Sequence, residues 1–291
     1  MKILICFGLG YSAQQWLNEH GSGFERIVAT TTDAARAASL NAEARPGFTA
    51  IPFDGTLASP ELNAAIAQSD AVLTSVPPDA SGDPVLKACG DALARAPLKS
   101  IVYLSSVGVY GNHDGAWVDE ASACRPMKDH NAYRLAAEQD WQALGQRMKA
   151  PVAILRLAGI YGPGRSALDN VKRGSARRIA KPGQVFNRIH VADVAQAIEA
   201  AFARRAQGIF NVTDNEPTPA GDPIVYAARL LGVEPPPEIS FDEAKKTMSA
   251  FAASFYTDVK RVRNAKLTSE LGVALLYPTY REGLSAIATT A

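Results

Sequence analysis

The chain has 291 residues, 47% of them hydrophobic, and a formal net charge of +1 at pH 7. This composition supplies enough apolar surface for a large core, whereas the near-neutral charge argues against a nucleic-acid partner, because nucleic-acid-binding domains usually carry a basic excess. Three scattered cysteines, four dispersed histidines and no long apolar run lead us to expect a reducing cytoplasmic location, no metal and no membrane partner.

Apolar runs rich in β-branched residues alternate with alanine-rich helical patterns through the first two thirds of the chain. This alternation predicts parallel β-α-β units in an α/β fold with a doubly wound, Rossmann-type sheet. Strands are predicted at 2–7, 26–31, 48–53, 71–76, 100–105, 152–157 and 208–213. Helices are predicted at 12–20, 33–41, 60–68, 84–95, 130–149 and 191–204, and further along at 222–232, 242–250 and 258–271.

The first predicted strand runs directly into a glycine-containing turn. Residues 8–13 read G-L-G-Y-S-A and precede a helical segment, which matches the G-x-G-x-x-A fingerprint of dinucleotide-binding folds. Gly8 would permit the tight turn, Gly10 would let the backbone approach a pyrophosphate, and the small Ala13 would let helix and strand pack closely. The phosphates would lie at the helix N-terminus, where unpaired N–H groups point. We therefore expect NAD or NADP, bound here by Gly8, Leu9, Gly10, Tyr11, Ser12 and Ala13.

The second predicted strand bears on the choice between these cofactors. NAD-type sites place an acidic residue about 20 positions beyond the glycines, where it binds the ribose 2′-hydroxyl. Here the strand ends at Thr31 and Thr32, and Asp33 lies late enough to be a helix N-cap. Arg36 follows within one turn, either to reach a 2′-phosphate or to lie on the surface of the second helix. The pattern favours NADP, with Thr31, Thr32 and Arg36 as binding residues.

The regular alternation ends after about residue 160, where prolines begin to cluster. We expect residues 1–160 to form the NAD(P)-binding core, with its sheet completed by about 185–213. Residues 161–184 and 214–291 would then form a small substrate-binding lobe at the cofactor edge. A basic cluster in this region is either a solvated helix face or a site for an anionic substrate; it consists of Lys172, Arg173, Arg177, Arg178 and Lys181.

Three further segments share a pattern with one enzyme family. Residues 103–111 read Y-L-S-S-V-G-V-Y-G, residues 155–164 read L-R-L-A-G-I-Y-G-P-G, and residues 188–195 read R-I-H-V-A-D-V-A. In order and spacing they resemble blocks of the extended short-chain dehydrogenases/reductases, the group that includes the NAD-dependent epimerases and dehydratases of nucleotide sugars. The resemblance covers roughly residues 1–215 and returns at 277–284. It implies oxidoreductase or epimerase chemistry on a small polar substrate, such as a nucleotide sugar.

The catalytic pair of that family is missing from the chain. The family uses a Tyr-x-x-x-Lys pair and an upstream Ser or Thr, with tyrosine as acid/base, lysine lowering its pKa, and the hydroxyl orienting the substrate. Ser106 falls on the hydroxyl position, but Arg134 stands where the lysine should be and His130 where the tyrosine should be. The chain therefore resembles the atypical branch that lacks the pair.

His130 and Arg134 are one helical turn apart and would share a face. A histidine with an ordinary pKa near 6.5 needs no neighbouring cation to exchange protons, so His130 is a candidate proton shuttle. Arg134 is a candidate for binding ribose hydroxyls, although it stays protonated. Alternatively, both are ordinary polar residues of a protein that has lost catalysis. Ser106 either contacts ligand or bonds nearby backbone.

Two arginines are candidates for substrate binding. Arg165 and Arg188 would hold a substrate phosphate in bidentate fashion, or else lie on the surface. Arg156 is expected to anchor backbone carbonyls. Two functions stay open: an NAD(P)-dependent oxidoreductase or epimerase-like enzyme, and a non-catalytic NAD(P)-binding redox sensor or interaction protein. The family resemblance also implies a homodimer formed through the helices at 84–95 and 130–149.

Overall fold

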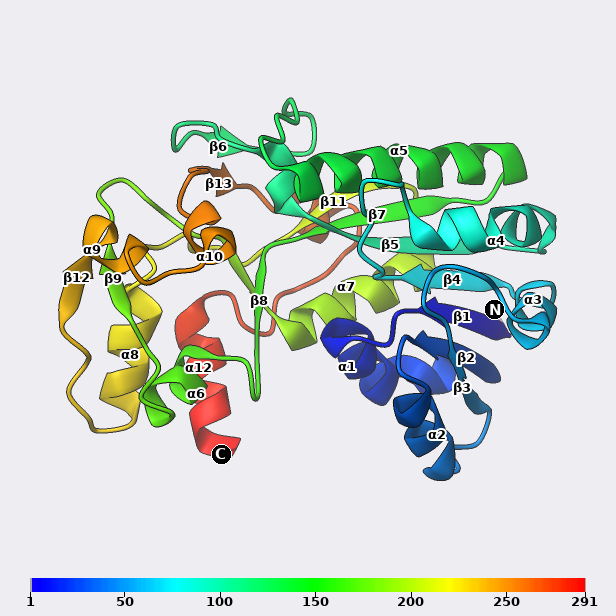
Figure 1. Cartoon of the computed structure of the whole chain (residues 1–291), viewed down its shortest axis with the longest axis horizontal. Helices are drawn as coiled ribbons and strands as arrows, with labels where there is room; N and C mark the ends of the chain where they lie inside the picture. The colour runs from blue at the N-terminus through cyan, green and yellow to red at the C-terminus, as the bar shows by residue number, and fades with distance from the viewer. Residues whose placement is uncertain (1, 291) are drawn as a thin grey trace.

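Seven parallel strands form the central sheet of the computed structural model, which describes residues 2–290 (Figure 1). Their order is β11-β7-β5-β4-β1-β2-β3, as in a doubly wound sheet. Each arises from an apolar run because a parallel strand is buried on both faces. The strands are β1 (Ile3–Phe7), β2 (Arg26–Thr31), β3 (Phe48–Pro52), β4 (Ala71–Thr74), β5 (Ser100–Ser106), β7 (Val152–Leu157) and β11 (Gly208–Val212). All seven lie at predicted strands, and the predicted Rossmann-type fold is confirmed.

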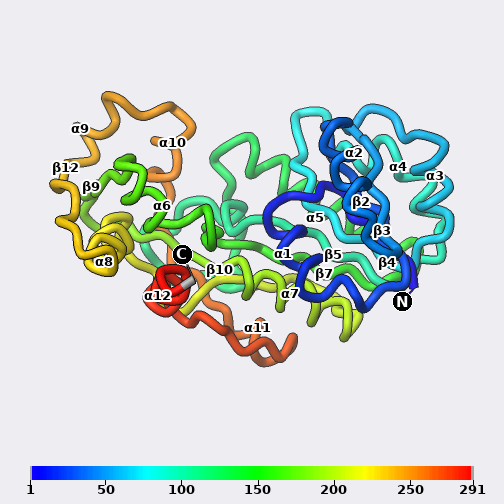
Figure 2. Tube along the Cα trace, turned by 90° about the horizontal axis from the view of Figure 1, so that it is seen from below, coloured from blue at the N-terminus to red at the C-terminus, as the bar shows by residue number. Residues whose placement is uncertain are grey.

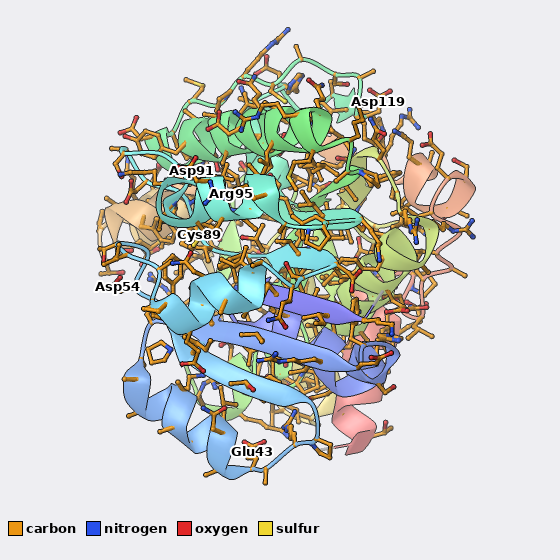
Figure 3. The ribbon with its side chains drawn as sticks, turned by 90° about the vertical axis from the view of Figure 1, so that its right-hand side faces the viewer. Glu43, Asp54, Cys89, Asp91, Arg95 and Asp119 are labelled. Carbon is orange, nitrogen blue, oxygen red and sulfur yellow. The ribbon has the colours of Figure 1, made fainter. Side chains whose placement is uncertain are left out.

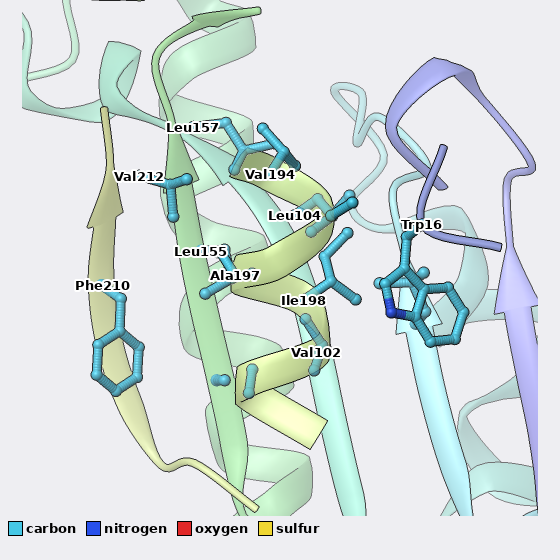
Figure 4. Packing of buried hydrophobic residues seen from close by; sticks show 14 of the residues in the cluster. Trp16, Val102, Leu104, Leu155, Leu157, Val194, Ala197, Ile198, Phe210 and Val212 are labelled. Atoms are coloured by element: carbon cyan, nitrogen blue, oxygen red, sulfur yellow. The ribbon is translucent and has the colours of Figure 1, made fainter. Parts of the chain in front are cut away.

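Helices cover both faces of this sheet. One face packs on α1 (Tyr11–His20) and α7 (Val191–Arg204), and Figure 4 shows Val194, Ala197 and Ile198 of α7 lying against strand residues. The other face packs on α3 (Pro60–Ile66), α4 (Pro84–Arg95) and α5 (Asp129–Met148). The remaining early helix, α2 (Ala34–Ala42), contacts β3. Asp33 caps α2 by accepting hydrogen bonds from the backbone, as predicted.

A smaller group of elements lies at the opposite end of the molecule from the N-terminus (Figure 2). Its core is a cluster around Tyr161, Leu168, Ala227 and Leu284. Two short parallel pairs join it, β8 (Gly159–Tyr161) with β10 (Arg188–His190) and β9 (Arg178–Ala180) with β12 (Glu238–Ser240). Its helices are α6 (Ala167–Lys172), α8 (Asp222–Leu230), α9 (Phe241–Lys245), α10 (Ala250–Ser254) and α12 (Tyr280–Thr290).

The segment after α10 returns to the central sheet. The helix predicted at 258–271 is wrong in its first half, since β13 (Arg261–Val262) pairs there with β6 (Trp117–Val118), and only α11 (Ala265–Ser269) is helical. Likewise, the helix predicted at 242–250 is two short ones, α9 and α10. Val262 and Leu267 are buried in the same cluster as α7 and the sheet. The assignment of a separate substrate-binding lobe stays a proposal.

The described residues carry neither a membrane-spanning helix nor a metal cluster. Between residues 2 and 290, no helix is both long and apolar enough to cross a bilayer, and no three His, Cys, Asp or Glu side chains gather as metal ligands would. Figure 3 shows Glu43, Asp54, Asp91 and Asp119 spread from one end of that view to the other.

Candidate functional site

The turn after β1 is held in place by the strands on either side of it. Gly8 has a φ of +81°, which favours glycine, and a Cβ there would come within 3.0 Å of the Ser75 hydroxyl. The Gly8 N–H donates to Thr30 Oγ1 at 3.0 Å, and Ser75 Oγ donates to the Gly8 carbonyl at 2.7 Å. The Leu9 N–H donates to the Thr30 carbonyl at 2.8 Å. The turn is therefore fixed by hydrogen bonds to its neighbours.

The start of α1 has the features that a dinucleotide pyrophosphate needs. Its N-cap is Gly10, no side chain caps the helix, and a Cβ at Gly10 would meet nothing within 4 Å. The first-turn N–H groups and the positive end of the helix dipole thus face open space. Ser12 and Ala13 are buried, while the Tyr11 hydroxyl donates to the Pro163 carbonyl at 3.0 Å. We call residues 8–13 the glycine turn; its geometry fits the expected cofactor.

Arg36 lies across the glycine turn. Its Nη2 donates to the Leu9 carbonyl at 2.7 Å. At the end of β2, Thr31 is buried and Thr32 is exposed, and Asp33 is occupied as the N-cap of α2. The tip of β2 therefore presents the Thr31 and Thr32 hydroxyls, followed by the Asp33 carboxylate, which caps α2 through Oδ1, and by the Arg36 guanidinium of α2.

A cavity of about 530 Å³ extends from the glycine turn along the carboxyl ends of β5 and β7 to the start of α5 and to residues 251–260. This is the edge at which doubly wound folds bind ligands. Of the predicted site residues, it brings together Gly10, Tyr11, Ser12, Ser106, His130, Arg134 and Arg165.

Each predicted catalytic side chain has distinct surroundings in this cavity. Ser106 is the last residue of β5, and its Oγ accepts a hydrogen bond from the Gly108 N–H at 3.0 Å. His130 is exposed, and partial burial followed by the charges of Lys128 and Arg134 lowers its pKa below 6.5. Arg134 is half-buried and donates from Nη1 to the Leu104 carbonyl at 3.0 Å. Arg134 is therefore partly engaged by the protein itself.

A buried ion pair lies behind Ser106. Arg156 on β7 donates to both carboxylate oxygens of Glu138 on α5, at 2.7–3.2 Å, and Ser105 on β5 donates to the same carboxylate. The expectation that Arg156 anchors backbone carbonyls is thus wrong, because its partner is a side chain. The pair joins β5, α5 and β7 at the point where they hold Ser106, His130 and the cavity floor.

The two predicted substrate arginines are placed differently. Arg165 is exposed, lies 5.8 Å from the centre of the Tyr11 ring, and lines both the main cavity and an adjoining one of about 400 Å³. Arg188 lines only the second cavity, and its guanidinium donates to the carbonyls of Phe186, Thr218 and Pro219. Arg165 is consequently the freer of the two.

The basic cluster at 172–181 does not form one helix face. Lys172 ends α6 and Arg173 lines the second cavity, whereas Arg178 belongs to β9 and pairs with Glu238 at 3.0 Å. Arg177 donates to Thr247, and Lys181 donates to the Tyr256 carbonyl. The interpretation as a single solvated helix face is therefore wrong.

Three charged residues of the main cavity were missed by the sequence analysis. Lys128 forms an ion pair with Asp258, Nζ to Oδ2 2.8 Å, and Lys260 Nζ donates to the Gly111 carbonyl at 2.9 Å. Burial lowers the pKa of Lys260 to about 8. No local motif marks these residues, since Asp258 and Lys260 reach the cavity only through the return of the chain after α10.

Comparison with known proteins places the chain in a family. A sequence model described as the NAD dependent epimerase/dehydratase family matches residues 84–213. Protein YeeZ of Escherichia coli strain K12 is 30% identical over 227 residues, which are 74% of this chain and 74% of that protein. The chain belongs to the NAD-dependent epimerase/dehydratase family. The resemblance drawn from the three sequence blocks is confirmed, and membership of this family together with the glycine turn supports NAD(P) as the cofactor.

A further sequence relative and two solved structures are also similar to the chain. A 3-diazoavenalumate denitrifying reductase from a Streptomyces species is 29% identical over 212 residues, 70% of this chain and 65% of the reductase, so the match spans less than two thirds of that enzyme. The structure of a functionally unknown conserved protein from Silicibacter pomeroyi superimposes with a TM-score of 0.86 at 41% identity, over 100% of this epimerase/dehydratase-family chain and 99% of that one. UDP-glucuronic acid 4-epimerase from Bacillus cereus, in complex with NAD, shares the fold, with a TM-score of 0.78 at 16% identity over 99% and 96% of the two chains.

Proposed function

We propose that this protein is an NAD(P)-dependent oxidoreductase acting on a small polar substrate in the main cavity. The observation that carries this proposal is that Ser106, His130 and Arg134 line the same cavity as the glycine turn. When bound, the nicotinamide cofactor supplies or accepts a hydride, and the protein supplies orientation and a proton. The Streptomyces relative is named as a reductase, and reductases are oxidoreductases.

Each of these side chains has a role that its surroundings allow. The Ser106 oxygen accepts from Gly108, so its hydroxyl hydrogen is free to donate to a substrate oxygen. Because its pKa is lowered, His130 is neutral near pH 7 and can take a proton from a substrate hydroxyl in the oxidative direction. The N–H groups of Arg134 that do not bind Leu104 can donate to ribose hydroxyls.

Arginine side chains bear on which cofactor and which substrate the protein binds. Two features favour NADP over NAD: Arg36 lies beside the glycine turn, and the Asp33 carboxylate at the end of β2 is engaged as the N-cap of α2. Arg165 and Arg173, in the adjoining cavity of about 400 Å³, would suit the phosphates of a nucleotide-linked substrate. Formation of a homodimer through α4 and α5 is also proposed; measurement of the molecular mass in solution tests it.

The test of the proposal has two stages. Calorimetric titration with NAD⁺, NADH, NADP⁺ and NADPH should show binding with a preference for the NADP pair. A screen of carbonyl and sugar-nucleotide substrates should then find turnover that His130→Ala lowers by about 10²–10⁴-fold. His20→Ala, on the end of α1 outside the cavity, is the matched control and should keep full activity. Failure to bind any of the four dinucleotides would refute the proposal, and unchanged turnover in His130→Ala would remove the role of His130.

A non-catalytic NAD(P)-binding sensor is the second candidate. It is favoured by the engagement of Arg134 with Leu104 and by the absence of tyrosine at position 130. A sensor would bind the dinucleotides, give no turnover across the screen, and bind a protein partner with an affinity that differs between NADPH and NADP⁺. Cofactor oxidation with any small carbonyl substrate would exclude it.

A further inference from the structure

The charges on the wall of the main cavity are unequal. Its lining residues include four cationic side chains, Lys128, Arg134, Arg165 and Lys260, but Asp258 is the one carboxylate among them. Lys128 is paired with Asp258, and Arg134 is bound to the Leu104 carbonyl. Lys260 forms no ion pair with any side chain of residues 2–290. The cavity wall therefore keeps an uncompensated positive charge.

Lys260 is the most deeply placed of these cations. The residue is 6% exposed, and its Nζ donates one hydrogen bond, to the Gly111 carbonyl at 2.9 Å. An ammonium has three N–H donors, so two are left for other partners. Burial lowers the pKa of Lys260, attraction to Asp258 opposes this, and the smaller repulsion from Lys128 adds to the lowering; with a pKa of about 8, the amine is mostly protonated at neutral pH. A buried ammonium is costly when the carboxylate nearest to it is already paired with another cation, as Asp258 is with Lys128, and an anionic ligand lowers that cost.

A second polar group that points to a ligand lines the same cavity. Asn131 is 6% exposed and lines the cavity, yet its side-chain amide makes no hydrogen bond to any of residues 2–290. The amide packs on Gly108, where a Cβ would come within 2.5 Å of Asn131 Oδ1. Neither Oδ1 nor Nδ2 of Asn131 is among the fully enclosed unpartnered polar atoms, so the amide reaches the cavity and is available there to a ligand. In addition, α5 begins beside Asn131 without a side-chain cap, so the positive end of a 20-residue helix borders this wall.

We propose that Lys260 and Asn131 form a binding site for a carboxylate group of the substrate. An ammonium together with a neutral amide matches a monoanion, whereas Arg165 and Arg173, which suit phosphates, line the adjoining cavity. Phe251 and Phe255 line the same cavity and are largely exposed, so they provide apolar surface for the body of the ligand. The substrate class is thus a carboxylate with an apolar or aromatic body. This inference deepens the proposed function and rests on it for the cavity being the substrate site.

Benzoate and benzamide are suitable probes because they share shape and differ in charge. Each is titrated into the full-length protein by calorimetry, with and without saturating NADP⁺. Benzoate should bind more tightly than benzamide by about tenfold or more, as expected for a charge-assisted hydrogen bond. Lys260→Met should remove this difference by weakening benzoate alone. Lys266→Met is the matched control, because that lysine also donates to a backbone carbonyl, that of Ile209, but lies outside the cavity.

The outcomes separate this inference from the proposed function. Equal affinities of benzoate and benzamide, no saturable benzoate binding, or benzoate binding retained in Lys260→Met would each overturn the carboxylate site. If Lys260→Met does not fold, as judged by its thermal transition, Asn131→Ala takes its place and should weaken benzoate several-fold relative to benzamide. A benzoate preference without any cofactor turnover would support the carboxylate site and count against the oxidoreductase. Turnover without a benzoate preference would do the reverse.

Discussion

The ion pair between Glu138 and Arg156 provides the sharpest test of how the site is held together. Their side chains are 2% and 3% exposed, and Arg156 makes three contacts to the carboxylate. Glu138→Gln keeps the shape of the side chain but leaves the guanidinium buried without a counter-charge. Removal of one partner from a buried pair costs about 3–5 kcal/mol. With an unfolding entropy of about 2.1 cal/mol/K per residue, this lowers the Tm of a 291-residue chain by about 5–8 °C.

Differential scanning calorimetry of the wild type and three variants measures this effect. The variants are Glu138→Gln, Arg156→Met and the double variant, which together give the coupling between the two side chains. Glu43→Gln is the control: Glu43 pairs with Arg45 at 2.8 Å, but the two side chains are 45% and 39% exposed, so the loss should be below about 1 kcal/mol. If Glu138→Gln and Glu43→Gln lower the Tm equally, the argument from burial is refuted.

Three further predictions concern the cofactor, the chemistry and the pH dependence. Arg36→Met should weaken NADP⁺ binding by about tenfold and leave NAD⁺ unchanged in calorimetry; equal weakening of both would contradict a contact to the 2′-phosphate. Ser106→Ala should lower turnover by about 10²–10³-fold with unchanged cofactor affinity, as measured by steady-state kinetics and calorimetry. Burial raises the pKa of Asp214 from 3.8 to about 7, so the folded protein binds a proton that the unfolded chain has released, and stability falls as the pH rises from 3.8 through 7. Asp214→Asn should remove this decrease of the unfolding free energy with pH, and near pH 8 it should be more stable than wild type by up to about 4 kcal/mol in urea unfolding. If the unfolding free energies of the two proteins change with pH in parallel, Asp214 does not cause the decrease.

The central sheet could be predicted from sequence because its signals are local. A parallel strand buried on both faces is a continuous apolar run, as Ile3–Phe7 and Val152–Leu157 illustrate. The G-x-G-x-x-A spacing of the glycine turn is also a local signal, although hydrogen bonds with Thr30 and Ser75, which are distant in sequence, hold the turn in place. Ser106, His130 and Arg134 could be located because the sequence blocks that contain them have fixed places on β5 and α5.

The rest of the site depends on contacts between distant parts of the chain. Arg156 and Glu138 both stand in recognisable blocks, but nothing in their spacing shows that β7 and α5 bring them together. The position of Lys260 in the cavity was even harder to predict from the sequence. Its position depends on a hydrogen bond to Gly111 and on the pairing of β13 with β6, whereas the local pattern at 258–271 is typical of a helix. Long-range pairing overrode local propensity there.

The return of the chain after α10 also affects how the protein is made. Val262, Leu267 and Leu271 complete the core beneath α7, and Asp258 and Lys260 complete the cavity wall. During synthesis the chain emerges from its N-terminus, so the seven strands of the sheet are available before this last part of the core. A nascent chain that ends before residue 257 would therefore expose an apolar surface beside an unfinished cavity. The sheet is fully covered only when the segment that contains Val262, Leu267 and Leu271 has left the ribosome.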